Sequence, residues 1–169
     1  MARRIVSVTT ISPTPTADAT NLVDATYPFI LQGGNATQLN RIHEISLSGQ
    51  SSASSGPMYM LLARDSTIAV TNSAGAGQTD APLDTATIAL TNPVLTGNTN
   101  TTKPQRSATL HLLNCSLNTY GGSFFWRANK IDECPAVIGA SINTGEVSLS
   151  AFTGGTSSPM GAHMIYESL

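Results

Sequence analysis

Short runs in which apolar and polar residues alternate constrain the fold of this chain more than any other feature. The clearest are residues 106–114, RSATLHLLN, and residues 146–152, EVSLSAF. Alternation at period two places successive side chains on opposite faces of a β-strand, so each run predicts a strand with one buried and one solvated face. No stretch has the length and 3.6-residue periodicity of a long helix. The sequence therefore predicts an all-β fold.

Candidate strands follow one another at the spacing expected of a sandwich or jelly roll. Residues 58–64 form the most apolar run of the first half and predict a central strand. Residues 143–145, NTG, predict a hairpin turn between their flanking strands, because glycine supplies a positive φ there. The candidate strands cover residues 1–11, 27–31, 41–49, 58–64, 86–90, 106–115, 123–128, 136–142, 146–152 and 161–167.

One domain accounts for the 169 residues, a length that can bury a substantial core. Pro13 and Pro15 hold the backbone extended and prevent regular strand pairing around them. We therefore predict a single β-sandwich domain of jelly-roll type over residues 17–169, preceded by an extended N-terminal arm over residues 1–16.

Charged residues are scarce, at 11% of the chain, and the formal net charge is -2. Nucleic-acid backbones are bound by clustered lysine and arginine, and only Arg3 and Arg4 are adjacent here, so nucleic acid is not an expected partner. No apolar stretch approaches the ~18 residues of a membrane span, and no apolar signal-peptide segment follows Arg4. We expect synthesis in a host cytoplasm and no membrane partner.

The two cysteines, Cys115 and Cys134, are too few for a disulfide framework. In a reducing compartment, two buried thiols are the favoured interpretation. A disulfide formed after release from the cell stays open as the alternative, because the two residues are close in sequence.

Residues that could carry chemistry are dispersed. His43, His111 and His163 lie far apart, and no H-x-x-x-H or C-x-x-C spacing predicts a metal site. The chain has no G-x-S-x-G sequence, and its only adjacent acidic pair is Asp132 and Glu133. A Cys/His pair could still meet in the fold. We predict no enzyme activity, no catalytic residue, no metal and no cofactor.

The one aromatic cluster covers residues 124–127, FFWR. Alternation places Phe124 and Trp126 on one face of the strand and Phe125 and Arg127 on the other. One pair is expected to anchor the core, while Phe125 meets a neighbouring sheet or subunit. The alternative is a sugar platform or an interface hot spot built from Trp126 and Arg127.

The N-terminal arm is the second candidate contact surface, because Arg3 and Arg4 precede an extended segment that could dock on a neighbouring subunit. Together with the aromatic cluster, it gives the predicted interface residues: Arg3, Arg4, Ile5, Pro13, Pro15, Phe125, Trp126 and Arg127.

Three segments resemble virion proteins of tailed phages, especially the head decoration (cement) and minor capsid proteins. They are residues 57–67, PMYMLLARDST, residues 125–128, FWRA, and residues 160–167, MGAHMIYE. The resemblance implies a β-rich fold, homotrimers at threefold positions of a capsid, and no catalysis.

We therefore expect a virion structural protein on the capsid surface that binds the major capsid protein and stabilises the lattice as an oligomer. Many modest contacts act together in such a lattice. The alternative is a carbohydrate- or receptor-binding module of a phage tail or fibre, which would use Trp126 as its platform together with loops 71–84 and 92–105. A third hypothesis is a coat protein that forms the shell itself.

Overall fold

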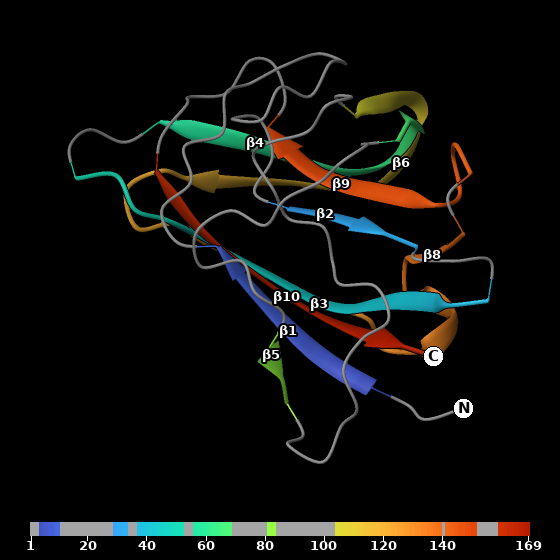
Figure 1. Cartoon of the computed structure of the whole chain (residues 1–169). Helices are drawn as coiled ribbons and strands as arrows, with labels where there is room; N and C mark the ends of the chain where they lie inside the picture. The colour runs from blue at the N-terminus through green and yellow to red at the C-terminus, as the bar shows by residue number, and fades with distance from the viewer. Residues whose placement is uncertain are drawn as a thin grey trace.

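The computed structural model describes residues 4–10, 29–33, 37–52, 56–68, 81–83, 104–139, 141–151 and 159–169. Within these ranges the chain is almost entirely β-structure, which confirms the predicted fold class (Figure 1). No helix there is long and apolar enough to cross a membrane. The elements are β1 (Arg4–Thr10), β2 (Phe29–Gln32), β3 (Leu39–Gly49), β4 (Pro57–Thr67), β5 (Ala81–Pro82), β6 (Gln105–Asn118), β7 (Ser123–Arg127), the 3-10 helix η1 (Ile131–Glu133), β8 (Ala136–Ile138), β9 (Glu146–Ala151) and β10 (Met160–Ser168).

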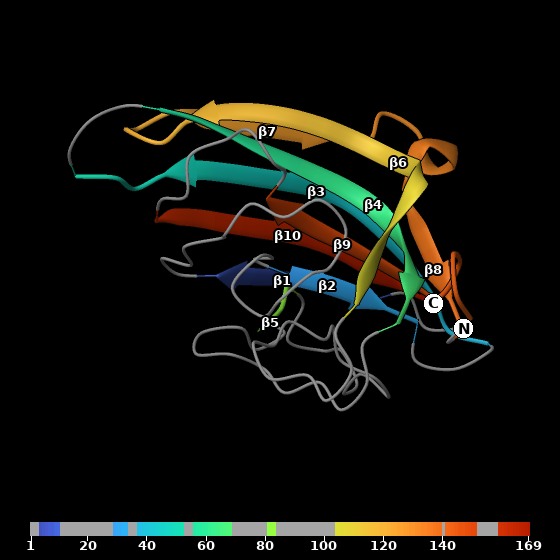
Figure 2. The same ribbon diagram turned by 90° about the horizontal axis from the view of Figure 1, so that it is seen from above.

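Two antiparallel sheets lie face to face, as the predicted sandwich requires (Figures 1 and 2). The first sheet has the order β5-β1-β10-β3-β7, and β8 also pairs with β3. The second has the order β2-β9-β4-β6, so β4 is a central strand as predicted. The candidate strand 86–90 lies outside the described residues. The jelly-roll connectivity stays a prediction, because residues 11–28, 69–80 and 84–103 also lie outside them.

The core lies between the sheets and is built from the apolar members of the alternating runs. Ile45 of β3 and Met164 of β10 face it from the first sheet, and Met60, Leu62 and Leu149 face it from the second. All five are at most 1% exposed. Fully burying a side chain of this size contributes roughly 1.5 to 3 kcal/mol, so this layer is the main source of stability.

The prediction of a hairpin turn at residues 143–145 is wrong. The residues do form a turn, and Asn143 has a φ of 62°. However, β8 pairs with β3 in the first sheet, whereas β9 lies in the second sheet between β2 and β4. A positive φ suits many tight turns, and here burial of Val137 and Val147 in the core places the flanking strands in different layers.

Strand β9 lacks the solvated face that its alternation predicts. Glu146, Ser148 and Ser150 point away from the sandwich core, yet each is 0% exposed. Their polar groups find partners on neighbouring strands: Ser148 Oγ donates to Asp65 Oδ1 at 2.6 Å, and Arg106 Nη1 donates to Ser150 Oγ. Hydrogen bonding therefore lets polar side chains occupy a buried outer face of the second sheet.

Two carboxyl groups meet in this buried layer. Asp65 hydrogen-bonds with Glu146, whose Oε2 also accepts a hydrogen bond from Gln32 Nε2 at 3.0 Å. Among the described residues, Asp65 Oδ2 has no hydrogen-bond partner, whereas Oδ1 accepts from Ser148. Burial raises the pKa of Asp65 from 3.8 to about 7, against the opposing effects of its bonds to Glu146 and Ser148 and of the Arg106 charge.

The free energy of unfolding is expected to fall as pH rises from about 4 to about 7. The folded protein keeps the Asp65 proton up to about pH 7, whereas the unfolded chain releases it near pH 4. Each unit of pKa difference corresponds to about 1.4 kcal/mol, so the fall should reach a few kcal/mol. Asp65→Asn should remove this dependence of the unfolding free energy on pH. Urea unfolding at a series of pH values measures that free energy. The same pH dependence in the variant as in the wild type would contradict its assignment to Asp65.

Candidate functional site

One side of the sandwich concentrates exposed apolar surface. Strands β6 and β7 each end their sheet and follow one another in the chain across the turn at residues 119–122, and Figure 2 shows them at the same side of the molecule. Of nine exposed large apolar side chains in the described ranges, Leu110 and Leu112 lie on β6, Phe125 lies on β7 and Tyr120 lies in the turn between them. We call this side the open edge.

Phe125 is the aromatic side chain of the open edge that faces outward from a strand. The register of β7 on β3 places Trp126 opposite Ile45 and Phe124 opposite Leu47, both of which face the core. Phe125 therefore points to the outer face, where it is 60% exposed. This is the alternation that the sequence predicts. Beside Phe125 lies a shallow hollow of about 480 Å³, lined mainly by small or polar groups that include Ser46, Ser48 and His163.

Trp126 belongs to β7, the last strand of the first sheet. It packs against the core and is only partly buried, and it lines a groove of about 460 Å³ between β6 and the segment after β7. Polar side chains surround it in the groove, among them Arg64, Arg127, Asn129 and Glu133. Arg64 is held by its Nη1, which donates to the carbonyl oxygen of Ala136. The groove thus combines an indole with charged and amide groups.

A β-bulge brings a histidine out of the first sheet next to this groove. Glu44 pairs with Ile165 and Ile42 pairs with Tyr166, so His43 is the extra residue of β3 opposite β10. Ile42 and Ile45 are both buried in the core, whereas His43 and Glu44 are partly exposed. Bulges of this kind re-aim a side chain.

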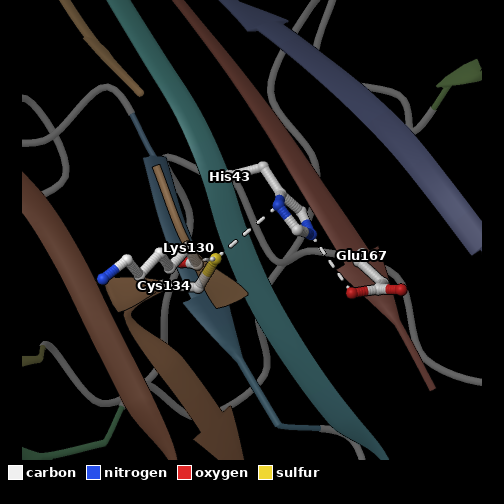
Figure 3. Close-up of polar contacts among 4 residues, drawn as sticks. All are labelled: His43, Lys130, Cys134 and Glu167. Carbon is white, nitrogen blue, oxygen red and sulfur yellow. Dashed lines mark hydrogen bonds and ion pairs between the residues drawn. The ribbon is translucent and has the colours of Figure 1, made fainter. Parts of the chain in front are cut away.

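His43 lies between a thiol and a carboxylate (Figure 3). Its Nδ1 is 3.6 Å from Cys134 Sγ, and its Nε2 is 3.1 Å from Glu167 Oε2. Cys134 follows η1 in the β7–β8 connection, and Glu167 belongs to β10, where it is only 2% exposed. The fold therefore joins a cysteine, a histidine and a glutamate in the order that nucleophilic catalysis uses.

The surroundings of Cys134 favour the thiol over the thiolate. Burial is the main cause that raises its pKa, and the carboxylates of Glu167, Glu133 and Asp132 act in the same direction against Arg41. Reactive cysteines need the opposite, an electropositive environment that lowers the pKa. The thiol also lies 3.7 Å from the carbonyl oxygen of Lys130, to which it donates. The cluster consequently ties the β7–β8 connection to β3 and β10.

Both cysteines are free and buried, Cys115 in the sandwich core and Cys134 beside His43. The favoured sequence interpretation of two buried thiols is thereby confirmed for the structure. Among the described residues, no three histidine, cysteine, aspartate or glutamate side chains gather in a way that could hold a metal ion.

The predicted interface residues fall in three places. Arg4 and Ile5 lie in β1, opposite Ser168 and Glu167 of β10, so residues 4–10 form a strand of the first sheet. Arg3, Pro13 and Pro15 lie outside the described residues, and an arm that reaches a neighbour stays a prediction. Phe125, Trp126 and Arg127 all belong to the open edge. Of the loops predicted for sugar binding, only residues 81–83 and 104–105 are described.

Sequence reasoning did not find the Cys134–His43–Glu167 cluster or the Asp65–Glu146 pair. Cys134 is 91 residues from His43, and Glu167 is 124 residues from His43. Asp65 and Glu146 lie on two different strands, β4 and β9. No local spacing in the sequence therefore indicates either group. Comparison of the chain with protein-family models, with curated proteins and with solved structures finds no match.

Alkylation should show that Cys134 is not activated. With iodoacetamide, its rate is expected to rise about tenfold per pH unit through neutrality and beyond, because only the thiolate reacts and burial raises its pKa. Cys115, with a pKa raised to about 12 by burial, should react only on unfolding. Mass spectrometry of the wild type and of Cys134→Ser assigns the two sites. A plateau near pH 7 that Cys134→Ser abolishes would instead indicate a thiolate held by His43.

Proposed function

We propose that this protein is a virion structural protein that binds the outer surface of a phage capsid lattice as a decoration protein. The observation that supports this most is the open edge, where the apolar side chains of Leu110, Leu112, Tyr120 and Phe125 are exposed. Protein contact surfaces are enriched in such aromatic and apolar side chains.

Phe125 is the proposed anchor on the capsid. It stands on a β-strand whose backbone is fixed by pairing with β3, so little conformational entropy is lost when a partner covers its ring. The small side chains of Ser46 and Ser48 beside it leave room for a partner surface. Repetition of this one contact over a lattice would turn modest affinity into stable attachment.

A structural role also accords with the chemistry of the cluster around His43. The only described thiol beside a histidine is Cys134, and its environment raises the thiol pKa. We propose that the protein has no catalytic function, that it acts as a homo-oligomer, and that the major capsid protein is its partner at the capsid surface.

Carbohydrate binding is the second candidate function, and the groove at Trp126 favours it. Indole rings stack on sugars, and the side chains of Arg127 and Asn129 beside it could hydrogen-bond hydroxyl groups. This would place the protein on a tail or fibre, where it would recognise a receptor.

Phe125→Ser should weaken binding to capsids assembled from the cognate major capsid protein by about tenfold or more, as loss of an interface anchor does. Co-sedimentation of purified protein with such capsids measures the effect. Leu83→Ser is the matched control, because Leu83 is 57% exposed and lies next to β5 at the opposite end of the first sheet. Wild-type protein that stays in the supernatant, or a Phe125→Ser variant that binds like the wild type, would contradict the proposal.

A glycan array separates the two functions. If the groove binds sugar, the wild type should give a signal that Arg127→Ala/Asn129→Ala lowers by about tenfold, since each lost hydrogen bond to a sugar contributes on the order of 1 kcal/mol. Both residues are exposed, so the variant should keep the wild-type melting temperature. Array binding without capsid binding would favour the receptor-binding role over decoration.

A further inference from the structure

Strand β6 has one side without a pairing partner. Along its other side it pairs with β4, from Pro57 opposite Asn118 to Leu62 opposite Leu113 and onward past a bulge. No strand in the described ranges pairs with the second side, and β6 closes the order of its sheet. Along the regular part, the side chains of Leu112, Asn114 and Ser116 are exposed. A free edge of this length offers backbone N–H and C=O groups to another strand.

The sequence of β6 lacks the usual protection of a free edge. Natural edge strands carry lysines, prolines, inward charges or bulges that prevent pairing with another chain. The irregular pairing is confined to the first half of β6. In that half, Ser107 Oγ accepts a hydrogen bond from the backbone N–H of Leu110. From residue 111 to residue 118, HLLNCSLN, no lysine, arginine, aspartate or glutamate is present. This half can therefore approach an identical strand without charge repulsion.

The core is incompletely covered at the same place. The partly buried apolar side chains that pack against the core are Leu113, Phe124 and Trp126, and all three belong to β6 or β7. A strand added beside β6 would extend the second sheet next to these side chains, and covering part of their apolar surface is favourable in proportion to the area covered.

A second copy of the chain can pair with this edge in the antiparallel sense. Directly opposed residues of an antiparallel pair lie on the same face, so core-facing Leu113, Cys115 and Leu117 must oppose core-facing residues of the copy. The register centred on Cys115 sets Leu113 opposite Leu117 and joins the two cores through apolar pairs. Shifting the centre to Asn114 sets Leu117 opposite His111, which is exposed, and loses that match.

We propose that two copies pair antiparallel through residues 113–117 of β6, with the twofold axis at Cys115, and so join their second sheets into one. The pairing stops before Asn118, whose backbone oxygen accepts from the N–H of Gly122. A symmetric pair of this kind buries the same patch of each copy. The inference rests on the proposed function for its biological purpose and replaces the homotrimer that the resemblance implies with a dimer, which presents two Phe125 anchors to the lattice.

A charge-swap experiment tests the pairing in the full chain. In the proposed register, Asn114 of one copy lies opposite Ser116 of the other, and both side chains are exposed. Light scattering should give the wild type twice the chain mass of 17.6 kDa. Asn114→Lys/Ser116→Lys should shift the mass to one chain, with a dissociation constant about tenfold or more higher, because like charges oppose each other. Mixing it with Asn114→Glu/Ser116→Glu should restore twice the mass.

The matched control carries the same added charge at exposed positions outside β6 and β7, Thr37→Lys/Ser141→Lys, and should keep the wild-type mass. Circular dichroism and melting temperature show that each variant folds. A monomeric or trimeric wild type, a paired double-lysine variant or a mixture that fails to pair would each overturn the proposed pairing.

The outcomes also distinguish this inference from the proposed function. Phe125→Ser should lose capsid binding and keep the paired mass, whereas the double-lysine variant should lose the paired mass. If the wild type pairs but binds no capsid, the capsid proposal fails and the pairing stands. If it binds capsids at the mass of one chain, the pairing fails and the capsid proposal stands.

Discussion

Apolar contact between the inner faces of two sheets is the interaction on which the rest of this structure depends. The side chains of Ile45 and Met164 meet those of Met60 and Leu149 in a layer from which water is excluded. Because the sheets meet face to face, the strands at their ends are left with one unpaired side. The open edge at β6 and β7 is a consequence of this arrangement, and Leu110, Leu112, Tyr120 and Phe125 are exposed there.

The alternation in the sequence was sufficient to predict the strands because side-chain burial on one face decides where strands form. It located β3, β4, β6, β7, β9 and β10 to within a few residues of their observed bounds. It did not decide which strands pair. The turn at residues 143–145 illustrates this. The sequence predicted a positive φ at its glycine, whereas Asn143 has it, and the link that the turn makes between two layers depends on long-range packing.

The candidate sites were less predictable for a similar reason. Phe125 could be assigned to the outer face, because alternation along a single strand is a local property. The approach of His43 to Cys134 depends instead on the bulge in β3 and on the path of the β7–β8 connection, neither of which has a local signature in this sequence. The buried Glu146 ran against expectation, since a glutamate at the start of an alternating strand ordinarily faces water.

The bulge at His43 also divides β3 into two segments of opposite phase. Even-numbered Ile42 and odd-numbered Ile45 both face the core, so the parity that marks an inward residue changes between them. Removal of one residue at this point would leave a regular strand in which Ile42 and Ile45, then two residues apart, still face the core. Without the bulge, the strand at its full length would alternate regularly, so Asn40 and Ile42 would turn outward while Arg41 turned into the core. The inward position of Asn40 and Ile42 therefore depends on one extra residue that is left out of the pairing with β10.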